Sequence, residues 1–156
     1  MLIDGDACPV LREAVKIASI RGFPVVLVGN DTQNLGRFAP LNGVSTIEVP
    51  TGRDSADFAL VTRVSPDDVV ITDDIGLASM VLGRKARVIS CRGHEFNNKT
   101  IDYDLHFRHL GQKIRRSGGR TKGPAPFTAG DREKFVVVLK HILSEVKKTG
   151  SKNQYW

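Results

Sequence analysis

Apolar residues along the chain form short continuous runs that alternate with stretches of helical spacing. The run Pro24-Val25-Val26-Leu27-Val28 is apolar throughout, which is typical of a central parallel strand buried on both faces. Five such strands are predicted, at residues 2–3, 24–28, 45–49, 68–72 and 86–90. Between them the spacing predicts helices at 9–22, with Pro9 at the first helical position and Gly22 as the C-cap, at 55–64 and at 75–82, ended by Gly83. Strands alternating with helices predict an α/β fold with right-handed crossovers and a parallel sheet.

The last third of the chain has a different pattern. Ile101, Leu105, Leu110 and Ile114 predict one helix that ends near residue 117. A loop rich in proline and glycine follows at 119–127. Thr128, with an aspartate three residues later, is expected to cap a final helix that runs to about residue 146. We therefore expect a single domain at 1–147 and a polar, disordered tail at 148–156.

Composition narrows the class of protein. The chain has 156 residues, 40% hydrophobic and 26% charged, which suits one globular core. No apolar run is long enough to span a bilayer, and Met1 leads directly into Leu2-Ile3 without a secretory signal, so we expect a cytoplasmic protein with no membrane partner. The two cysteines, Cys8 and Cys91, fit a reducing compartment and do not make a disulfide framework.

Basic residues gather in one part of the chain. The net charge is +6, and no acid occurs between Asp104 and Asp131. This stretch carries Arg108, Lys113, Arg115, Arg116, Arg120 and Lys122. Such a patch suits a phosphate-rich partner, although a solvated basic face explains the same run of charges.

Aspartates occur where three predicted elements meet one edge of the sheet. Asp4 and Asp6 follow the first strand, Asp54 and Asp57 open the helix after the third, and Asp73-Asp74 follow the fourth. Ligands of open α/β sheets bind beyond the carboxyl ends of the strands, so these groups are expected to converge.

Two explanations of these aspartates remain open. Aspartate is favoured at helix N-termini as a cap, and any one pair suits that role. A cap needs only one acid, whereas like charges within ~4 Å repel by roughly 4 kcal/mol at an effective dielectric near 20. A divalent cation removes this repulsion, and oxygen ligands favour Mg²⁺ or Mn²⁺. The histidines have no metal-ligand spacing.

Several segments resemble those of a known family. Asp4-Gly5-Asp6-Ala7-Cys8-Pro9 resembles the opening of the bacterial YaiI/YqxD family, with glycine replacing the usual alanine at position 5. Further similar segments are Gly52-Arg53-Asp54-Ser55-Ala56-Asp57, the run from Val70 to Ala78, Arg92-Gly93, and Gly123-Pro124-Ala125-Pro126-Phe127 with Asp131-Arg132 and Phe135.

The resemblance implies a three-layer PIN-like fold with strand order 3-2-1-4-5, flanked by helices and extended by C-terminal helices. PIN-like relatives are mostly metal-dependent ribonucleases. Carried over to this chain, the resemblance implies catalytic roles for Asp4, Asp6, Asp54, Asp57 and Asp74, with metal ligation by Asp4, Asp54, Asp57 and Asp74. Asp73 stands at a variable position of the family. The helical glutamate of many PIN nucleases has no counterpart, since Glu13 and Glu48 fall elsewhere.

Three functions are compatible with this reading. The first is a Mg²⁺- or Mn²⁺-dependent nuclease, acting on RNA rather than DNA, in which Arg115, Arg116, Arg120 and Lys122 hold the nucleic-acid backbone. The second is a haloacid-dehalogenase-like phosphatase that uses Asp4 and Asp6, although its Lys and Ser/Thr cannot be assigned. The third is a PIN-like module that binds nucleic acid without catalysis. The sequence does not indicate an oligomeric state.

Overall fold

Strands and helices alternate along the first ninety residues, as the apolar runs predict. The computed structural model describes residues 1–6, 8–30, 34–38, 40–52 and 54–146; the tail predicted to be disordered lies outside the described residues. The strands are β1 (Leu2–Asp4), β2 (Val25–Asn30), β3 (Val44–Val49), β4 (Val69–Ile71), β5 (Arg87–Ile89) and β6 (Glu95–Phe96). The helices are α1 (Leu11–Arg21), α2 (Ser55–Val61), α3 (Ile75–Gly83), α4 (Ile101–Arg116) and α5 (Ala129–Glu145), with a short 3₁₀ helix, η2 (Leu35–Phe38).

The sheet has the order β3-β2-β1-β4-β5-β6. The five predicted strands pair in parallel and confirm the order 3-2-1-4-5. β6 was not predicted; it pairs antiparallel with β5 at the edge of the sheet. Two residues are too short a run to show alternation, so the sequence pattern could not reveal this strand.

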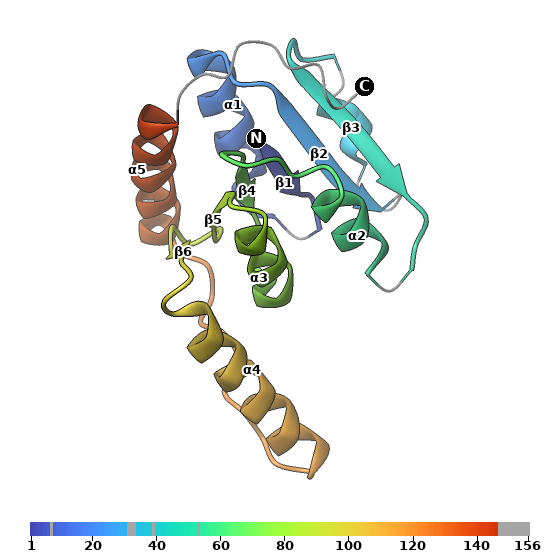
Figure 1. Ribbon diagram of the computed structural model, residues 1–156, viewed down its shortest axis with the longest axis vertical. Helices are drawn as coiled ribbons and strands as arrows, with labels where there is room; N and C mark the ends of the chain where they lie inside the picture. The colour runs from blue at the N-terminus through green and yellow to red at the C-terminus, as the bar shows by residue number, and fades with distance from the viewer. Residues whose placement is uncertain (7, 31–33, 39, 53, 147–156) are drawn as a thin grey trace.

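Alternate residues of the strands supply two separate hydrophobic cores. Ile3, Leu27 and Ile71 face α1 and α5, while Leu2 and Val70 face α2 and α3. This alternation follows from the two-residue period of a strand. Figure 1 shows the resulting three layers, with α1 and α5 behind the sheet and α2 and α3 in front.

Capping residues fix the ends of several helices. Gly22 has φ 70°, in the left-handed region, and ends α1 as predicted. Thr128 and Asp131 form the predicted capping box of α5. The predicted start of α1 at Pro9 was wrong, because the helix begins at Leu11. Helix α2 ends at Val61, three residues before the predicted end.

A cluster of family-like residues attaches α5 to the end of β5. Arg92 pairs with Asp131, 2.7 Å between Nη1 and Oδ2, and its guanidinium lies 5.5 Å from the centre of the Phe127 ring. Arg132 lies 5.3 Å from the same ring and also pairs with Glu13 of α1. These contacts give the segments around Arg92 and Phe127 a structural role, and they place Glu13 in this ion pair.

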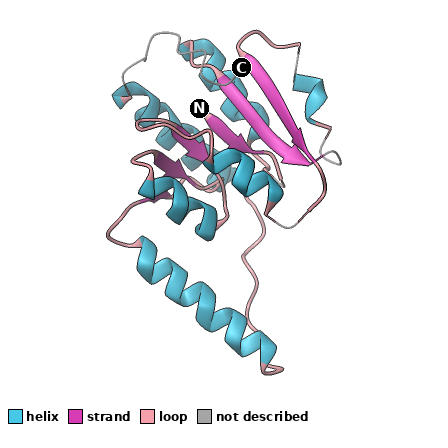
Figure 2. Ribbon diagram, turned by 45° about the vertical axis from the view of Figure 1, so that its right-hand side comes forward, coloured by secondary structure: helices cyan, strands magenta, loops and turns pink. Residues whose placement is uncertain are grey.

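Helix α4 projects from the body of the protein. Ile101 is buried and Leu105 packs against the α3 side of the core, whereas the second half of the helix extends beyond the sheet layers (Figure 1). The loop that follows returns alongside α4 to α5. A second view shows the helix and the returning loop as the two separate segments of this arm (Figure 2).

The described helices range in length up to the 17 residues of α5. Within the described ranges, none of them combines the length and apolarity that a membrane span needs.

Candidate functional site

The carboxyl ends of β1 and β4 bring Asp4 and Thr72 together. Leu2 pairs with Val70 in the parallel ladder, so Asp4 and Thr72 lie one pair beyond Ile3 and Ile71. Both therefore point to the face covered by α2 and α3. The Thr72 hydroxyl, fully buried, donates to Asp4 Oδ2 at 2.9 Å.

Asp6 lies beside Asp4 on the turn after β1. The Gly5 amide donates to the Val28 carbonyl at 2.7 Å, which continues the pairing with β2 by one residue. The Asp6 amide donates to Asp4 Oδ1 at 3.2 Å, and Asn30 Nδ2 donates to Asp6 Oδ1 at 3.3 Å. The end of β2 thus helps to orient the Asp6 carboxylate.

The two aspartates of α2 do not act as its side-chain cap. Asp54 occupies the N-cap position with φ 60°, but its side chain makes no capping hydrogen bond. A left-handed conformation is unfavourable for a residue other than glycine, and such strain concentrates at functional sites. Asp57 lies in the first turn of the same helix. For this pair the capping explanation does not hold.

Asp74 does cap its helix. Its Oδ1 accepts from the amides of Gly76 at 2.7 Å and Leu77 at 3.1 Å. The same oxygen accepts from Arg108 Nη1 of α4 at 2.9 Å, and Thr72 Oγ1 accepts from the Asp74 amide at 3.0 Å. The carboxylate is therefore held in place by three donors, while its Oδ2 takes no part in these bonds.

Asp73 is turned to the other side of the sheet. It follows Thr72, so the alternation of the strand directs it away from Asp4. Its Oδ1 accepts from the Cys91 amide at 2.7 Å, and Cys91 Sγ lies 3.6 Å from Cys8 Sγ. The Cys8 hydrogen bond and burial raise the pKa of the Cys91 thiol. Asp73 thus has a structural partner of its own.

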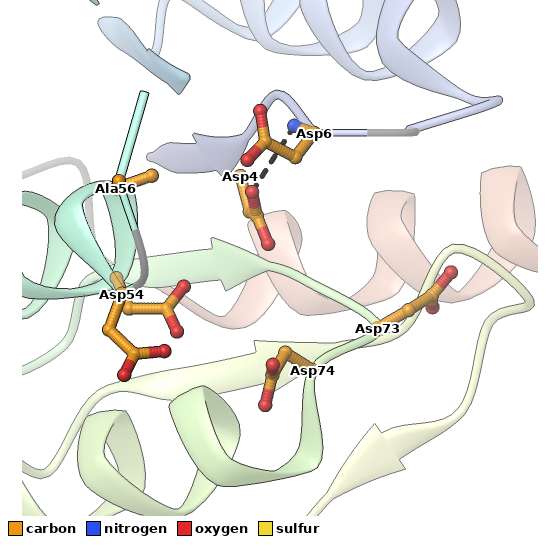
Figure 3. Close-up of a pocket in the computed structure, with 8 residues that line it drawn as sticks. Asp4, Asp6, Asp54, Ala56, Asp73 and Asp74 are labelled. Carbon is orange, nitrogen blue, oxygen red and sulfur yellow. Dashed lines mark hydrogen bonds between the residues drawn. The ribbon is translucent and has the colours of Figure 1, made fainter. Parts of the chain in front are cut away.

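These segments line one pocket of about 430 Å³. The lining residues are Asp4, Asp6, Gly52, Asp54, Ala56, Asp57, Asp73 and Asp74. Figure 3 shows Asp4 and Asp6 on one side, Asp54 and Asp74 across from them, and Asp73 directed away. Six of these eight residues are aspartates, and none of the eight is Lys, Ser or Thr.

The site penalises negative charge. Burial is the main cause that raises the pKa of Asp4, to about 6. Hydrogen bonds from the Thr72 hydroxyl and the Asp6 amide act in the opposite direction, and repulsion from Asp6 and Asp57 raises the pKa further. Burial also raises the pKa of Asp57, and the charges of Asp74, Asp54 and Asp6 raise it further. The carboxylates from all three segments are therefore close enough to repel one another.

This arrangement is not a ready-made metal site. Among the residues described, no three His, Cys, Asp or Glu side chains lie close enough together to hold one ion. The donor set, made only of carboxylate oxygens, still has the chemistry that hard divalent ions prefer. Binding one ion would therefore require a rearrangement that brings Asp54 or Asp57 toward Asp4 and Asp74.

A second hollow of about 570 Å³ lies along α4. It is lined by Asp102, Leu105, His106, Arg108, His109 and Gln112. Arg108 lines this hollow and bonds Asp74, so the two hollows meet at its side chain. Arg115 is seven residues further along α4, about 10 Å beyond Arg108. The basic residues at the tip are thus set apart from the carboxylates.

The structure brings together all five aspartates named from the sequence, in the single pocket described above. The predicted cationic residues Arg115, Arg116, Arg120 and Lys122 are exposed at the arm's tip, where Arg115 bonds Thr121. The sequence reading gave no role to Thr72, Asn30 or the Arg108–Asp74 pair. Strand alternation puts Thr72 on the same face as Asp4 only once the register of β1 and β4 is known.

A three-layer α/β protein with an acidic pocket at the switch point of its sheet is the class that this geometry defines. The chain belongs to the family described as "Uncharacterized BCR, YaiI/YqxD family", whose model matches residues 2–145. It is 41% identical to a UPF0178 protein of Exiguobacterium sibiricum over 92% of this chain and 95% of the relative. A UPF0178 protein of Bacillus mycoides is 39% identical over 91% of this chain and 97% of its own length. No solved structure matches the chain.

Proposed function

We propose that the protein is a Mg²⁺- or Mn²⁺-dependent phosphodiesterase that cleaves RNA. The observation that carries this proposal is the convergence of carboxylates from three chain segments, at the carboxyl ends of β1 and β4, in one pocket whose described lining residues include six aspartates. The raised pKa values of Asp4 and Asp57 support it. Burial is their main cause, repulsion from neighbouring carboxylates adds to it, and a bound cation offsets both by its attraction to the carboxylates.

Each carboxylate has a distinct part in the proposed site. Asp4, Asp74 and either Asp54 or Asp57 would hold the ion, with Asp74 already oriented by the amides of α3. Asp6, oriented by Asn30, would ligate the ion or accept a proton from the attacking water. The ion would polarise the phosphate and lower the pKa of that water.

The arm provides a place for the nucleic-acid backbone. Arg108 adjoins both hollows, and Arg115, Arg116, Arg120 and Lys122 continue the positive charge toward the tip. A backbone lying along α4 would therefore carry one phosphate near Arg108, next to the carboxylates. Guanidinium groups suit such phosphate contacts.

The deciding experiment combines calorimetric titration of Mn²⁺ and Mg²⁺ with cleavage assays on single-stranded RNA and DNA. Asp57→Asn and Asp74→Asn are expected to lose ion binding and cleavage together. Asp67→Asn is the matched control, because Asp67 is exposed and precedes β4, at the opposite edge of the sheet. The proposal fails if the wild type binds no divalent ion and an Asp4→Asn/Asp74→Asn variant is more stable with no change in activity.

Two other functions are outcomes of the same experiment. RNA binding that is sensitive to salt and survives loss of the aspartates, without cleavage, would indicate a non-catalytic module. Turnover of para-nitrophenyl phosphate that Asp4→Asn abolishes, without RNA cleavage, would indicate the phosphatase. The pocket argues against the latter, since no lysine is among the lining residues that the structure describes.

A further inference from the structure

Four exposed apolar side chains form a stripe along α4. Tyr103, Phe107, Leu110 and Ile114 are 65%, 53%, 42% and 46% exposed. The described chain exposes nine large apolar side chains in all, so nearly half of them lie on this one helix. The Tyr103 and Phe107 rings, 4.6 Å between centroids, already contact each other along the stripe.

The spacing of the stripe is that of a coiled-coil seam. Its members are separated by four, three and four residues, which corresponds to alternating a and d positions over one and a half heptads. Each a or d side chain of such a seam normally packs against a second helix. In the described residues no helix packs over this stripe, as its exposure shows.

The stripe points away from the body of the protein. Ile101 and Leu105 are the α4 residues that pack against the α3 side of the core, and Arg108 is the one that bonds Asp74. At 3.6 residues per turn, these three lie on the side of the helix nearly opposite to Phe107 and Leu110. The arm is also set off from the sheet layers in both views (Figures 1 and 2). The stripe therefore faces away from the described helices and strands, and Gly119 of the return loop adjoins it only at Ile114.

The distribution of charge along α4 favours a second copy of the same helix as the partner of the stripe, in an antiparallel orientation. The first turn carries Asp102 and Asp104, and the last turn carries Lys113, Arg115 and Arg116. A second copy of α4 laid antiparallel places each acidic turn beside a basic turn, whereas a parallel copy places like charges together. The helix dipoles also favour the antiparallel arrangement.

We propose that this stripe is a homodimer interface, in which the α4 helices of two copies pack antiparallel as a short coiled coil. A two-fold axis between Phe107 and Leu110 sets Phe107 of one copy against Leu110 of the other, and Tyr103 against Ile114. The interface is closed, because each copy uses the same patch. The proposal does not depend on the nuclease activity, since the stripe lies on the side of α4 opposite to Arg108.

Sedimentation velocity between about 1 and about 300 µM tests the proposal, because a short two-helix interface is expected at the small, weakly bound end of the range of interfaces. We expect the wild type to pass from monomer to dimer in this range. Phe107→Glu/Leu110→Glu should remain monomeric, with an unchanged unfolding temperature because both positions are exposed. Ile20→Glu is the matched control: Ile20 is 75% exposed on α1, and its variant should dimerise like the wild type.

Charge reversal tests the direction of packing. Asp102→Lys should weaken the dimer about threefold at low salt and little at high salt, and Lys113→Glu in the same chain, which flanks the stripe on the same side as Asp102, should restore it. A parallel pair, in which the two acidic turns lie side by side, would be strengthened by Asp102→Lys alone. A wild type that stays monomeric at the highest concentration, or a dimer that survives Phe107→Glu/Leu110→Glu, overturns the proposal. If instead the wild type is monomeric and these variants lose binding of single-stranded RNA, nucleic acid is the occupant and the proposal is wrong.

Discussion

Asp4 is the residue at which folding and function oppose each other. Its carboxylate is held at the end of β1 by the Thr72 hydroxyl and by the Asp6 amide, yet burial and its acidic neighbours raise its pKa to about 6 from the usual 3.8. Between these two values the folded state binds a proton that the unfolded chain has lost. The stability from this group is therefore complete below about pH 4 and is lost as the pH rises through about 6.

The expected size of this effect is about 2–3 kcal/mol for the ion-free protein, since each pKa unit corresponds to about 1.4 kcal/mol. Urea unfolding between about pH 4 and about pH 7 measures it. Asp4→Asn should remove most of this slope and be more stable than the wild type at neutral pH, while Asp67→Asn should keep it. Saturating Mn²⁺ should reverse the slope near neutral pH. A wild type whose stability rises steadily over this range would contradict the expectation.

Arg108 places a fixed positive charge of the protein next to the acidic pocket. Its guanidinium neutralises Asp74 and lowers the pKa of Asp57 against the other causes. We expect Arg108→Gln to bind Mn²⁺ several-fold more tightly, because the ion no longer competes with a fixed positive charge. Calorimetry of this variant beside Arg84→Gln, an exposed arginine at the end of α3, makes the comparison. Weaker binding would mean that Arg108 positions Asp74 more than it competes for it.

At the level of elements, the junction between β5 and α5 depends on Gly93. Its φ is +76°, and a Cβ there would lie 2.8 Å from the Phe135 amide nitrogen in α5. Gly93→Ala should therefore destabilise the protein by about 2–3 kcal/mol, through both strain and the displacement of α5. Gly83→Ala is a suitable control, because a Cβ at that position meets nothing within 4 Å. Urea unfolding distinguishes the two, and equal stability of both variants would refute the role of Gly93.

The elements that the sequence predicted best were those with long apolar patterns or explicit caps. The run at 24–28 became β2, and Thr128 with Asp131 became the capping box of α5. The apolar spacing that includes Leu110 and Ile114 predicted α4 correctly as a helix. It carried no information about which side of α4 packs against the rest of the protein. Periodicity defines an apolar face, while the partner of that face is a tertiary property.

On the scale of the whole molecule, the basic arm and the acidic pocket form an electrostatic pair. Arg115, Arg116, Arg120 and Lys122 lie at the arm's tip, away from the carboxylates that would repel a nucleic acid. Single-stranded RNA should therefore bind in a salt-dependent way, with a slope of about 0.7 per cation in a double-logarithmic plot. Replacing all four by glutamine should lower that slope by about 3 and leave Mn²⁺ binding intact.

Fluorescence anisotropy with labelled RNA at several salt concentrations measures this slope. Arg12→Gln/Lys16→Gln serves as the control, because these residues are exposed on α1, which covers the other face of the sheet. An unchanged slope in the fourfold variant would show that the arm does not hold the RNA backbone.

The candidate site was predictable because the carboxyl ends of parallel strands meet at one edge. That rule alone brings Asp4, Asp57 and Asp74 into one pocket from three segments. It could not give the supporting contacts from Asn30 or Arg108, since these depend on where β2 ends and how α4 crosses α3. Nor could it separate Asp73 from Asp74, for which the register of a three-residue strand is decisive.

The alternation of β1 and β4 also limits how this family can change in length. One residue inserted before Asp4 would turn its carboxylate toward α1, and one inserted before Thr72 would turn the Thr72 hydroxyl toward the cysteines and away from Asp4. Both strands are thus expected to keep a constant length among relatives, whatever happens to their apolar residues. Insertions and deletions should accumulate instead in the return loop of the arm, where no ladder fixes the count of residues.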